Sequence, residues 1–261
     1  MTDTIKRLNQ ERYARAAEKY VASPVHATGM GLPRLLELAE MQSDWRVLDV
    51  ATGGGHTALH FAPHVQEVIA TDFTEKMAHA AQNFIQEQGI TNIRFCGADA
   101  EILPFTNDSF DLVTCRVAAH HFPDIFAFVQ ESYRVLKPHG TLLIHDHVVP
   151  NKPKMADYIN AYEKLRDPAH ARALPEYEWR GLLFDAGFSI AHIEQFTIEH
   201  DIVPWAKRQN CSDETIEQLG ILLLRAPEKV QSWMQPQYIG TEHARYTDHH
   251  IILKGVKDYA S

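Results

Sequence analysis

The segment from Arg46 to Thr57 constrains this chain more than any other part of it. An apolar run that carries one acid, Asp49, leads into three successive glycines, Gly53 to Gly55, and then into a sequence compatible with a helix. A strand, a glycine turn and a helix start in this order build a nucleotide-type site, because glycine lets backbone N–H groups approach a ligand closely. A carboxylate buried alone in a parallel strand is costly. Asp49 therefore implies a positive or hydrogen-bond-donating partner at the end of the strand.

Two ligands are compatible with this turn. The spacing Gly53-x-Gly55-x-x-Ala58 fits the dinucleotide fingerprint, and Asp72, about 20 residues on, could hold a ribose. That fingerprint brings a pyrophosphate to the helix N-terminus, where Asp49 would be a like charge. S-adenosylmethionine carries no phosphate, and its sulfonium and ammonium groups suit a nearby acid. The glycines alone do not choose between the two ligands.

From Trp45 onward the pattern alternates between strands and helices. Strands are expected at 46–51, 67–71, 92–96, 110–115 and 141–145, with helices between them near 56–63, 74–88 and 124–136. Strict alternation with short loops predicts a parallel sheet covered by helices on both faces. After the fifth strand the rhythm breaks, and we expect helices in 150–172, 176–186 and 200–247, and strands at 189–199 and 250–256.

Composition limits the class of protein. The chain has 261 residues, enough for one structural domain, which we divide into an N-terminal helical cap (1–41), a ligand-binding core (42–150) and a remainder of sheet with helical inserts (151–261). No apolar run approaches the ~20 residues of a membrane span, and the first residues lack the apolar core of a secretion signal. Cys96, Cys115 and Cys211 offer neither a disulfide framework nor a metal knuckle. We expect a cytoplasmic protein that does not bind membranes, and a net charge of −9 opposes binding to nucleic acid.

Two further acids follow the next two strands. Asp72 ends the second strand, where its carboxylate could accept both hydroxyls of a ribose, or could simply precede a helix that starts after Thr74. Asp99 lies in the loop after the third strand and could accept the exocyclic amine of an adenine, with Ala98 and Ala100 beside the ring. The alternative for Asp99 is a plain acidic turn.

Together these segments resemble the motif series of the class I S-adenosylmethionine-dependent methyltransferases. The matching segments are Val47–Gly55, Asp72, Ala98–Phe105, Phe110–Val113 and Val135–Gly140. The chain is most similar to the small-molecule group related to the ubiquinone and menaquinone C-methyltransferases, of methyltransferase type 11. The resemblance covers residues 40–150. It implies a Rossmann-like, seven-stranded and mostly parallel α/β sheet whose last strand, 250–256, is antiparallel and lies beside strand 189–199, with helices on both faces and helical lid segments.

The resemblance also assigns residues to the cofactor. It implies that the methionine part of S-adenosylmethionine lies against Asp49, Ala51, Thr52, Gly53 and Gly55. Asp72 would take the ribose, Asp99 and Ala100 the adenine, and Cys115 would lie beside the sulfonium. Ala51 stands where the family often has its first glycine, and alanine suits that position if its φ is negative.

Histidines at two strand ends are the candidate catalytic groups. His120 and His121 follow the fourth strand and could deprotonate an acceptor hydroxyl, amine or acidic carbon, since imidazole titrates near neutral pH. The alternative is a capping or packing role, because positioning alone accelerates methyl transfer. His145 and His147 end the fifth strand and either face the substrate or form a metal site with His120 or His121. Nothing in the resemblance requires a metal, so no metal ligand is predicted, and the other histidines, including His249 and His250, are expected at the surface.

Segments without chemistry of their own are expected to cover the sheet edge as a lid. Tyr158, Tyr162 and Trp205 could line an acceptor pocket there, with ordinary core packing as the alternative. Arg166-Asp167-Pro168 is either a turn or a polar contact in that pocket.

The sequence thus predicts an S-adenosylmethionine-dependent methyltransferase acting on a small molecule. The alternatives are a nicotinamide-dependent oxidoreductase and a non-catalytic protein that binds S-adenosylmethionine. The acceptor and the oligomeric state, a homodimer included, stay open.

Overall fold

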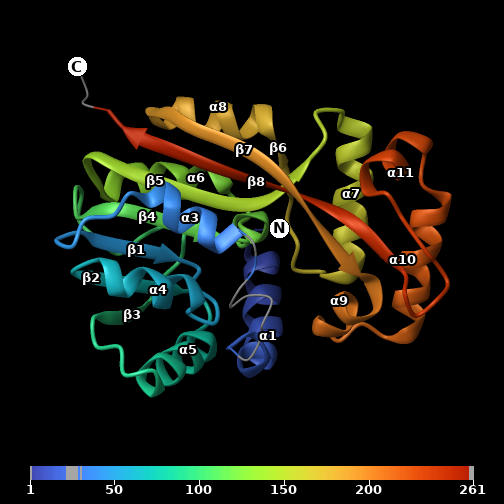
Figure 1. The fold of residues 1–261 in the computed structure, drawn as a ribbon, viewed down its shortest axis with the longest axis horizontal. Coiled ribbons are helices and arrows are strands. Elements are labelled where there is room, and N and C mark those ends of the chain that lie inside the picture. Colours follow the sequence, from blue (N-terminus) through green and yellow to red (C-terminus); the bar gives the residue numbers. More distant parts are fainter. Residues whose placement is uncertain (1, 22–28, 30, 259–261) are drawn as a thin grey trace.

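The protein, represented by a computed structural model, is described over residues 2–21, 29 and 31–258, which form one twisted sheet flanked by helices (Figure 1). Across the sheet the strands follow the order β3-β2-β1-β4-β5-β8-β7, and β6 pairs separately with β5. Strand β8 is antiparallel to β5 and β7, and the other pairs are parallel. The predicted α/β sheet with an antiparallel last strand is confirmed. The strands are β1 Arg46–Val50, β2 Glu67–Asp72, β3 Ile93–Gly97, β4 Phe110–Arg116, β5 Leu136–Val149, β6 Leu174–Pro175, β7 Phe188–Asp201 and β8 Arg245–Lys257.

Helices cover both faces because successive residues of a strand point to opposite sides of the sheet. In β1, Val47 packs with Leu35 of α3 and Phe61 of α4 on one face, whereas Leu48 packs with Phe128 of α6 on the other. The helices are α1 Thr2–Val21, α3 Gly31–Ala39, α4 His56–Phe61, α5 Glu75–Glu87, α6 Ile125–Val135, α7 Pro153–Arg166, α8 Glu176–Ala186, α9 Ile202–Arg208, α10 Asp213–Arg225 and α11 Glu228–Met234, with 3-10 turns η1 Ala62–His64 and η2 Ala119–His121.

A second apolar core forms at one end of the sheet. Helices α7, α9, α10 and α11 gather there beside the ends of β7 and β8 (Figure 1). Their buried side chains include Tyr162, Trp205, Leu219, Val230 and, from β8, Tyr246. None of the helices in the described part of the chain is long and apolar enough to cross a membrane. The division into a cap, a core and a remainder stays a prediction.

The strands of the second half are longer than predicted. Strand β5 begins at Leu136, because the Pro138-His139-Gly140 turn is absorbed as an irregularity with His139 at a φ of 64° instead of ending the pairing. Strand β8 begins at Arg245, which pairs with Asp201 of β7. Strands β7 and β8 form a long antiparallel ribbon. This ribbon extends beyond 250–256, the apolar segment from which the last strand was predicted. The two-residue β6 was not predicted.

Parallel strands end on the same edge of a sheet, and the loops at that edge hold ligands in folds of this kind. The carboxyl ends of β1, β2, β4 and β5 meet there. Helix α1 packs against α5 beside this edge. The fold therefore gathers four of the chemically distinctive loops under one N-terminal helix.

Candidate active site

A cavity of about 460 Å³ lies at the carboxyl edge of the sheet. One part, which we call the acidic half, is lined by the loops after β1, β2 and β3, including residues 51–54, Asp72, Asp99 and Ala100. The other part, the histidine half, is lined by His120, His121, His145, His147, His200 and His250. Helix α1 adds Lys6, Asn9 and Tyr13 to the wall, so the N-terminal helix covers the cavity as a lid.

Asp49 supports the glycine loop from below instead of lining the cavity. Its carboxylate is almost fully buried and accepts hydrogen bonds from Thr52 Oγ1 at 2.6 Å and from Thr114 Oγ1 at 2.8 Å. Burial raises the pKa of Asp49, and the two hydroxyls act in the opposite direction. The hydrogen-bond donors predicted for this acid are thus two hydroxyl groups of the protein itself. Asp49 would act on a ligand only through the glycine loop that it orients.

The glycine loop requires left-handed backbone at three positions. Ala51, Gly53 and Gly55 have φ values of 54°, 55° and 81°. The expectation of a negative φ at Ala51 is therefore wrong: the turn imposes a conformation that costs an L-residue roughly 1–2 kcal/mol. Gly55 does not line the cavity. A Cβ on Gly55 would lie 2.8 Å from Ile85 Cδ1, so this glycine lets α4 and α5 pack closely.

Asp72 lines the acidic half at the tip of β2. Its carboxylate accepts the backbone N–H groups of Gly53 at 3.0 Å and Thr74 at 2.8 Å. Burial raises the pKa of Asp72 to about 6, although these hydrogen bonds by themselves would lower it. Among the side chains that the structure describes, none forms an ion pair with Asp72. The site thus presents a largely buried carboxylate that can accept hydrogen bonds from a ligand.

Asp99 and Ala100 also line this half, and Asp99 has a partner that the sequence did not suggest. Lys6 of α1 lies 2.6 Å from Asp99 Oδ2 and 2.6 Å from Glu101 Oε2. Burial by itself would lower the pKa of Lys6, but its two acidic partners raise it. These ion pairs attach the N-terminal helix to the loop after β3.

At the end of β4 the residue that lines the cavity is Arg116, next to the one that was predicted. Cys115 is fully buried and packs in the core between β1 and α6, so its side chain does not reach the cavity. Side chains alternate along a strand, which turns Arg116 the other way. Arg116 Nε donates to Thr57 Oγ1 at 3.0 Å. The positive charge of this buried guanidinium is attracted to the carboxylate of Asp49.

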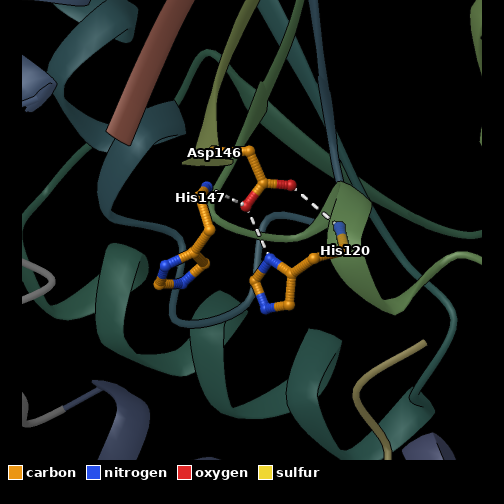
Figure 2. Close-up of side chains that lie close together, drawn as sticks. All are labelled: His120, Asp146 and His147. Carbon is orange, nitrogen blue, oxygen red and sulfur yellow. Dashed lines mark hydrogen bonds and ion pairs between the residues drawn. The ribbon is translucent and has the colours of Figure 1, made fainter. Parts of the chain in front are cut away.

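His120 is held by Asp146 of β5, as Figure 2 shows. The ring Nδ1 lies 2.5 Å from Asp146 Oδ1, and the His120 backbone N–H donates to Asp146 Oδ2 at 2.8 Å. The backbone N–H of His147 completes the shell of Asp146 at 2.8 Å. Although burial alone would raise the pKa of Asp146, attraction to His120 and the hydrogen bond from its ring hold that pKa well below its usual range. An ionised acid thus orients one imidazole of the cavity wall.

His121 has both of its ring nitrogens engaged. Nε2 lies 2.7 Å from the Tyr13 hydroxyl and Nδ1 lies 3.1 Å from the Ala169 carbonyl oxygen. Burial and repulsion by His120 lower the pKa of His121 to about 4, against the attraction of Asp167. His121 is therefore neutral at physiological pH and connects helix α1 to the cavity.

The segments expected to form a lid divide into cavity wall and core. Trp205, Arg166 and Asp167 line the cavity, so the Arg166-Asp167-Pro168 turn is a polar contact in the pocket. Tyr158 and Tyr162 instead pack in the core around α7. The expectation of a surface position is wrong for His250, which is 3% exposed, because β8 lies between β5 and β7 in the sheet.

Comparison with known proteins identifies the family to which this chain belongs. Residues 48–144 match the model of a family described as a methyltransferase domain. The uncharacterized methyltransferase YcgJ of Bacillus subtilis (strain 168) is 40% identical over 200 residues, which are 77% of this chain and 79% of that protein. The chain belongs to the class I S-adenosylmethionine-dependent methyltransferases.

Structure and sequence agree on this membership. The crystal structure of YcgJ superimposes on this methyltransferase with a TM-score of 0.84 and 34% identity, covering 88% of this chain and 98% of that one. A demethylmenaquinone methyltransferase of Listeria welshimeri is 31% identical over 151 residues, 55% of this chain and 64% of the relative. The protein is an enzyme, and the nicotinamide-dependent and non-catalytic interpretations are set aside.

S-adenosylmethionine is the cofactor of this methyltransferase, and the acidic half fits it. This part of the cavity offers acceptors to hydroxyl and ammonium groups at Asp72 and Asp99 and apolar contact at Ala100 and Met77. The arrangement does not resemble a pyrophosphate site, where carboxylates beside the glycine loop would repel the ligand. Sequence reasoning missed Lys6, Arg116 and the orienting role of Asp146, since each depends on contacts between distant segments.

Proposed function

We propose that this methyltransferase transfers the methyl group of S-adenosylmethionine to a small-molecule acceptor bound in the histidine half of the cavity. The observation that carries the proposal is the His120–Asp146 pair, a base-like imidazole fixed by a buried carboxylate at the wall of that half. The covering helix α1 and the net charge of −9 both favour a small acceptor over a nucleic acid.

For the cofactor we propose the following contacts. Asp72 accepts hydrogen bonds from the ribose hydroxyls, and Asp99 and Ala100 hold the adenine. The loop of Ala51, Thr52 and Gly53 surrounds the methionine part, with Asp49 and Gly55 fixing the loop and Cys115 packing beneath it. When bound, S-adenosylmethionine supplies an electrophilic methyl group on a positively charged sulfur.

For the acceptor we propose that His120 is the base. The His120 nitrogen that bonds Asp146 is Nδ1, so Nε2 is the nitrogen that takes the proton of an acceptor hydroxyl, amine or acidic carbon. An ionised carboxylate behind an imidazole fixes the tautomer and stabilises the imidazolium that forms. The neutral His121 ring and Tyr13 would then position the acceptor and exclude water.

One named relative supports a small-molecule acceptor. The Listeria welshimeri relative is named for a demethylmenaquinone substrate, and it aligns over little more than half of this chain. We extend to this methyltransferase only the class of a small organic acceptor. The further proposal that the acceptor becomes a better nucleophile on losing a proton depends on the His120–Asp146 pair.

The test is release of S-adenosylhomocysteine from S-adenosylmethionine in the presence of a panel of phenols, quinols, amines, thiols and β-dicarbonyls. We expect turnover with one ionisable class, a strong loss in His120→Gln, and unchanged turnover in His64→Gln, whose side chain is exposed and does not line the cavity. Methylation of nucleic acid or protein with no small-molecule turnover would overturn the proposal.

A further inference from the structure

The histidine half contains a second group of side chains that the proposed chemistry does not use. One oxygen of Asp248, Oδ2, is surrounded by three imidazole nitrogens. They are His147 Nδ1 at 2.8 Å, His250 Nε2 at 3.1 Å and His200 Nε2 at 3.5 Å. We call these four residues the Asp248 cluster.

The Asp248 cluster is a product of strand register. His147 of β5 pairs directly with His250 of β8, and residues that pair across antiparallel strands share a face of the sheet. Asp248 lies two positions before His250 on that face, opposite Ile198 of β7. His200 lies two positions beyond Ile198. Three neighbouring strands therefore present the four side chains to one end of the cavity.

Hydrogen bonding accounts for only part of this arrangement, the contact between His250 Nε2 and Asp248 Oδ2 at 3.1 Å. A carboxylate oxygen offers about two lone-pair sites, whereas three nitrogens lie within 3.5 Å of Asp248 Oδ2. His147 Nδ1 is buried, and although it lies 2.8 Å from this oxygen, it has no hydrogen bond of acceptable geometry with any of the residues described. An ion pair between His147 and Asp248 can hold the two atoms at this distance, and the same pair of atoms can also be directed at a common third atom.

The spacing matches a coordination shell. Ligand atoms held about 2.0–2.1 Å from a tetrahedral zinc ion lie roughly 3.3 Å from one another. The ligand atoms of His147, His250 and Asp248 lie within 4.8 Å of one another, and the two ring nitrogens lie 2.8 and 3.1 Å from Asp248 Oδ2, close to that value. Imidazole with one carboxylate is a ligand set for zinc-like first-row ions, whereas magnesium and calcium prefer oxygen alone.

We propose that His147, His250 and Asp248 bind one divalent transition-metal ion of the zinc class, with His200 contacting Asp248 from the edge of the site. The three imidazoles line the cavity, so an exchangeable position on the ion would face the acceptor. His145 supports the site from behind, since its Nε2 lies 3.1 Å from His250 Nδ1 and can fix the orientation of that ring. Ligand histidines usually have such a partner on the second nitrogen. This proposal departs from the sequence-based expectation of no metal ligand.

The neighbouring group of His120, Asp146 and His147 is a different kind of site. Asp146 already accepts hydrogen bonds from the His120 ring, the His120 backbone and the His147 backbone, so its oxygens are committed (Figure 2). The 2.5 Å contact between His120 Nδ1 and Asp146 Oδ1 is too short for an ion to lie between them. The ion therefore belongs beside Asp248.

The experiment measures metal binding without cofactor or acceptor, so its failure would not bear on methyl transfer. The full chain is stripped with a chelator, then titrated with Zn²⁺ by calorimetry and with Co²⁺ by visible ligand-field absorption, with Mg²⁺ as the oxygen-preferring comparison. The variants are His250→Gln, Asp248→Asn and His200→Gln. Of these, His200→Gln should disturb folding least, because His200 is only partly buried. The matched control is His249→Gln, because His249 stacks on Trp233 and bonds the Trp233 carbonyl oxygen instead of joining the cluster.

We expect one Zn²⁺ or Co²⁺ per chain, a Co²⁺ spectrum of low coordination number, and at least ~10-fold weaker binding in each folded cluster variant. His249→Gln and the wild type should bind alike, and Mg²⁺ should not compete. Absence of saturable Zn²⁺ and Co²⁺ binding in the wild type would overturn the proposal. Equal Zn²⁺ affinity in the wild type and in every folded cluster variant, His200→Gln included, would overturn it as well, because the ion would then lie elsewhere.

Discussion

The carboxylate of Asp146 contacts His120 twice, through Oδ1 to the ring Nδ1 at 2.5 Å and through Oδ2 to the backbone N–H at 2.8 Å. The second contact fixes the backbone from which the ring projects, and the first fixes the rotation of the ring. Asp146 therefore orients His120 in position and in tautomer. The pair joins β5 to the turn η2 after β4, and His120 lines the cavity.

The first prediction concerns this pair. Asp146→Asn should lower kcat by about 10²–10⁴, because the amide can favour the wrong tautomer of His120 and no longer stabilises the imidazolium. Affinity for S-adenosylhomocysteine should stay within about twofold, since Asp146 does not belong to the acidic half. Steady-state kinetics and calorimetry measure the two quantities.

A double variant sharpens this test. If the two residues act as one unit, His120→Gln combined with Asp146→Asn should lose no more activity than the worse single variant. Additive losses would instead assign the residues independent roles, and a kcat unchanged in Asp146→Asn would remove the dyad altogether.

The second prediction concerns cofactor binding. Asp72→Asn should weaken S-adenosylhomocysteine binding by roughly 1.5–3 kcal/mol, because a charge-assisted pair with the ribose hydroxyls is replaced by a neutral one. Asp108→Asn is the matched control, since Asp108 is exposed and pairs with Lys257 away from the cavity. Calorimetric titration checks both variants, and equal affinity in Asp72→Asn would assign the ribose to another residue.

The third prediction follows from the raised pKa of Asp72. Burial raises this pKa from 3.8 to about 6, so between these values the unfolded chain loses a proton that the native state keeps. The contribution of Asp72 to stability therefore falls as pH rises through this window and stays low above it. Unliganded Asp72→Asn should exceed the wild type in free energy of unfolding by up to about 3 kcal/mol at neutral pH, and the difference should shrink toward pH 4.

Urea unfolding of both proteins across this pH range measures the difference directly. Comparison of the variant with the wild type is needed because His121 contributes a slope of the opposite sign. A variant that is less stable than the wild type at neutral pH, or a difference independent of pH, would contradict the assignment of Asp72 as a carboxylate that burial disfavours.

The fourth prediction concerns the charge of His121. Because burial and His120 lower its pKa from 6.5 to about 4, the native state resists protonation that the unfolded chain accepts, and His121 costs stability as pH falls through that window. Nitrogen-detected NMR of labelled histidine should show a neutral His121 ring down to about pH 5. His121→Gln should retain more of its stability at acidic pH than the wild type. A His121 titration midpoint above 6 would show that the ring is exposed in solution.

The fifth prediction concerns the N-terminal helix. Lys6→Met should increase amide exchange in α1 and weaken S-adenosylhomocysteine binding a few-fold, because the ion pairs with Asp99 and Glu101 attach α1 over the acidic half. The effect is modest, since partly exposed pairs contribute about 0.2–1 kcal/mol each. Arg7→Met serves as control, for Arg7 is exposed and pairs with Glu11 of the same helix. Identical exchange in the two variants would show that Lys6 does not hold the helix.

Much of the first half of the fold could be predicted from local sequence. Strand β1, the glycine turn and helix α4 all lie within residues 46–61, and each has its own signal in hydrophobic pattern or backbone chemistry. Asp72 and Asp99 were placed at the cavity for the same reason, because a residue that ends a parallel strand must lie at the ligand-binding edge. Local pattern did not settle the sign of φ at Ala51, which the geometry of the closed turn imposes.

The errors share one cause. Cys115 and Arg116 are neighbours in the sequence, and only the alternation of side chains along β4, fixed by pairing with β1 and β5, decides which of them faces the cavity. His250 looked like a surface residue because its burial comes from β8 lying between β5 and β7. Neither relationship has a signal within a short window of sequence.

The sequence by itself determined the family, the cofactor and the acidic half of the cavity, because those features depend on short segments whose backbone and charge pattern carry the information. The tertiary structure alone decided the histidine half. His120 meets Asp146, and His147 meets Asp248 and His250, through the register of strands that are up to about a hundred residues apart in the chain. Register is set by the packing of the whole sheet, so chemistry that depends on it becomes visible only once the sheet has formed.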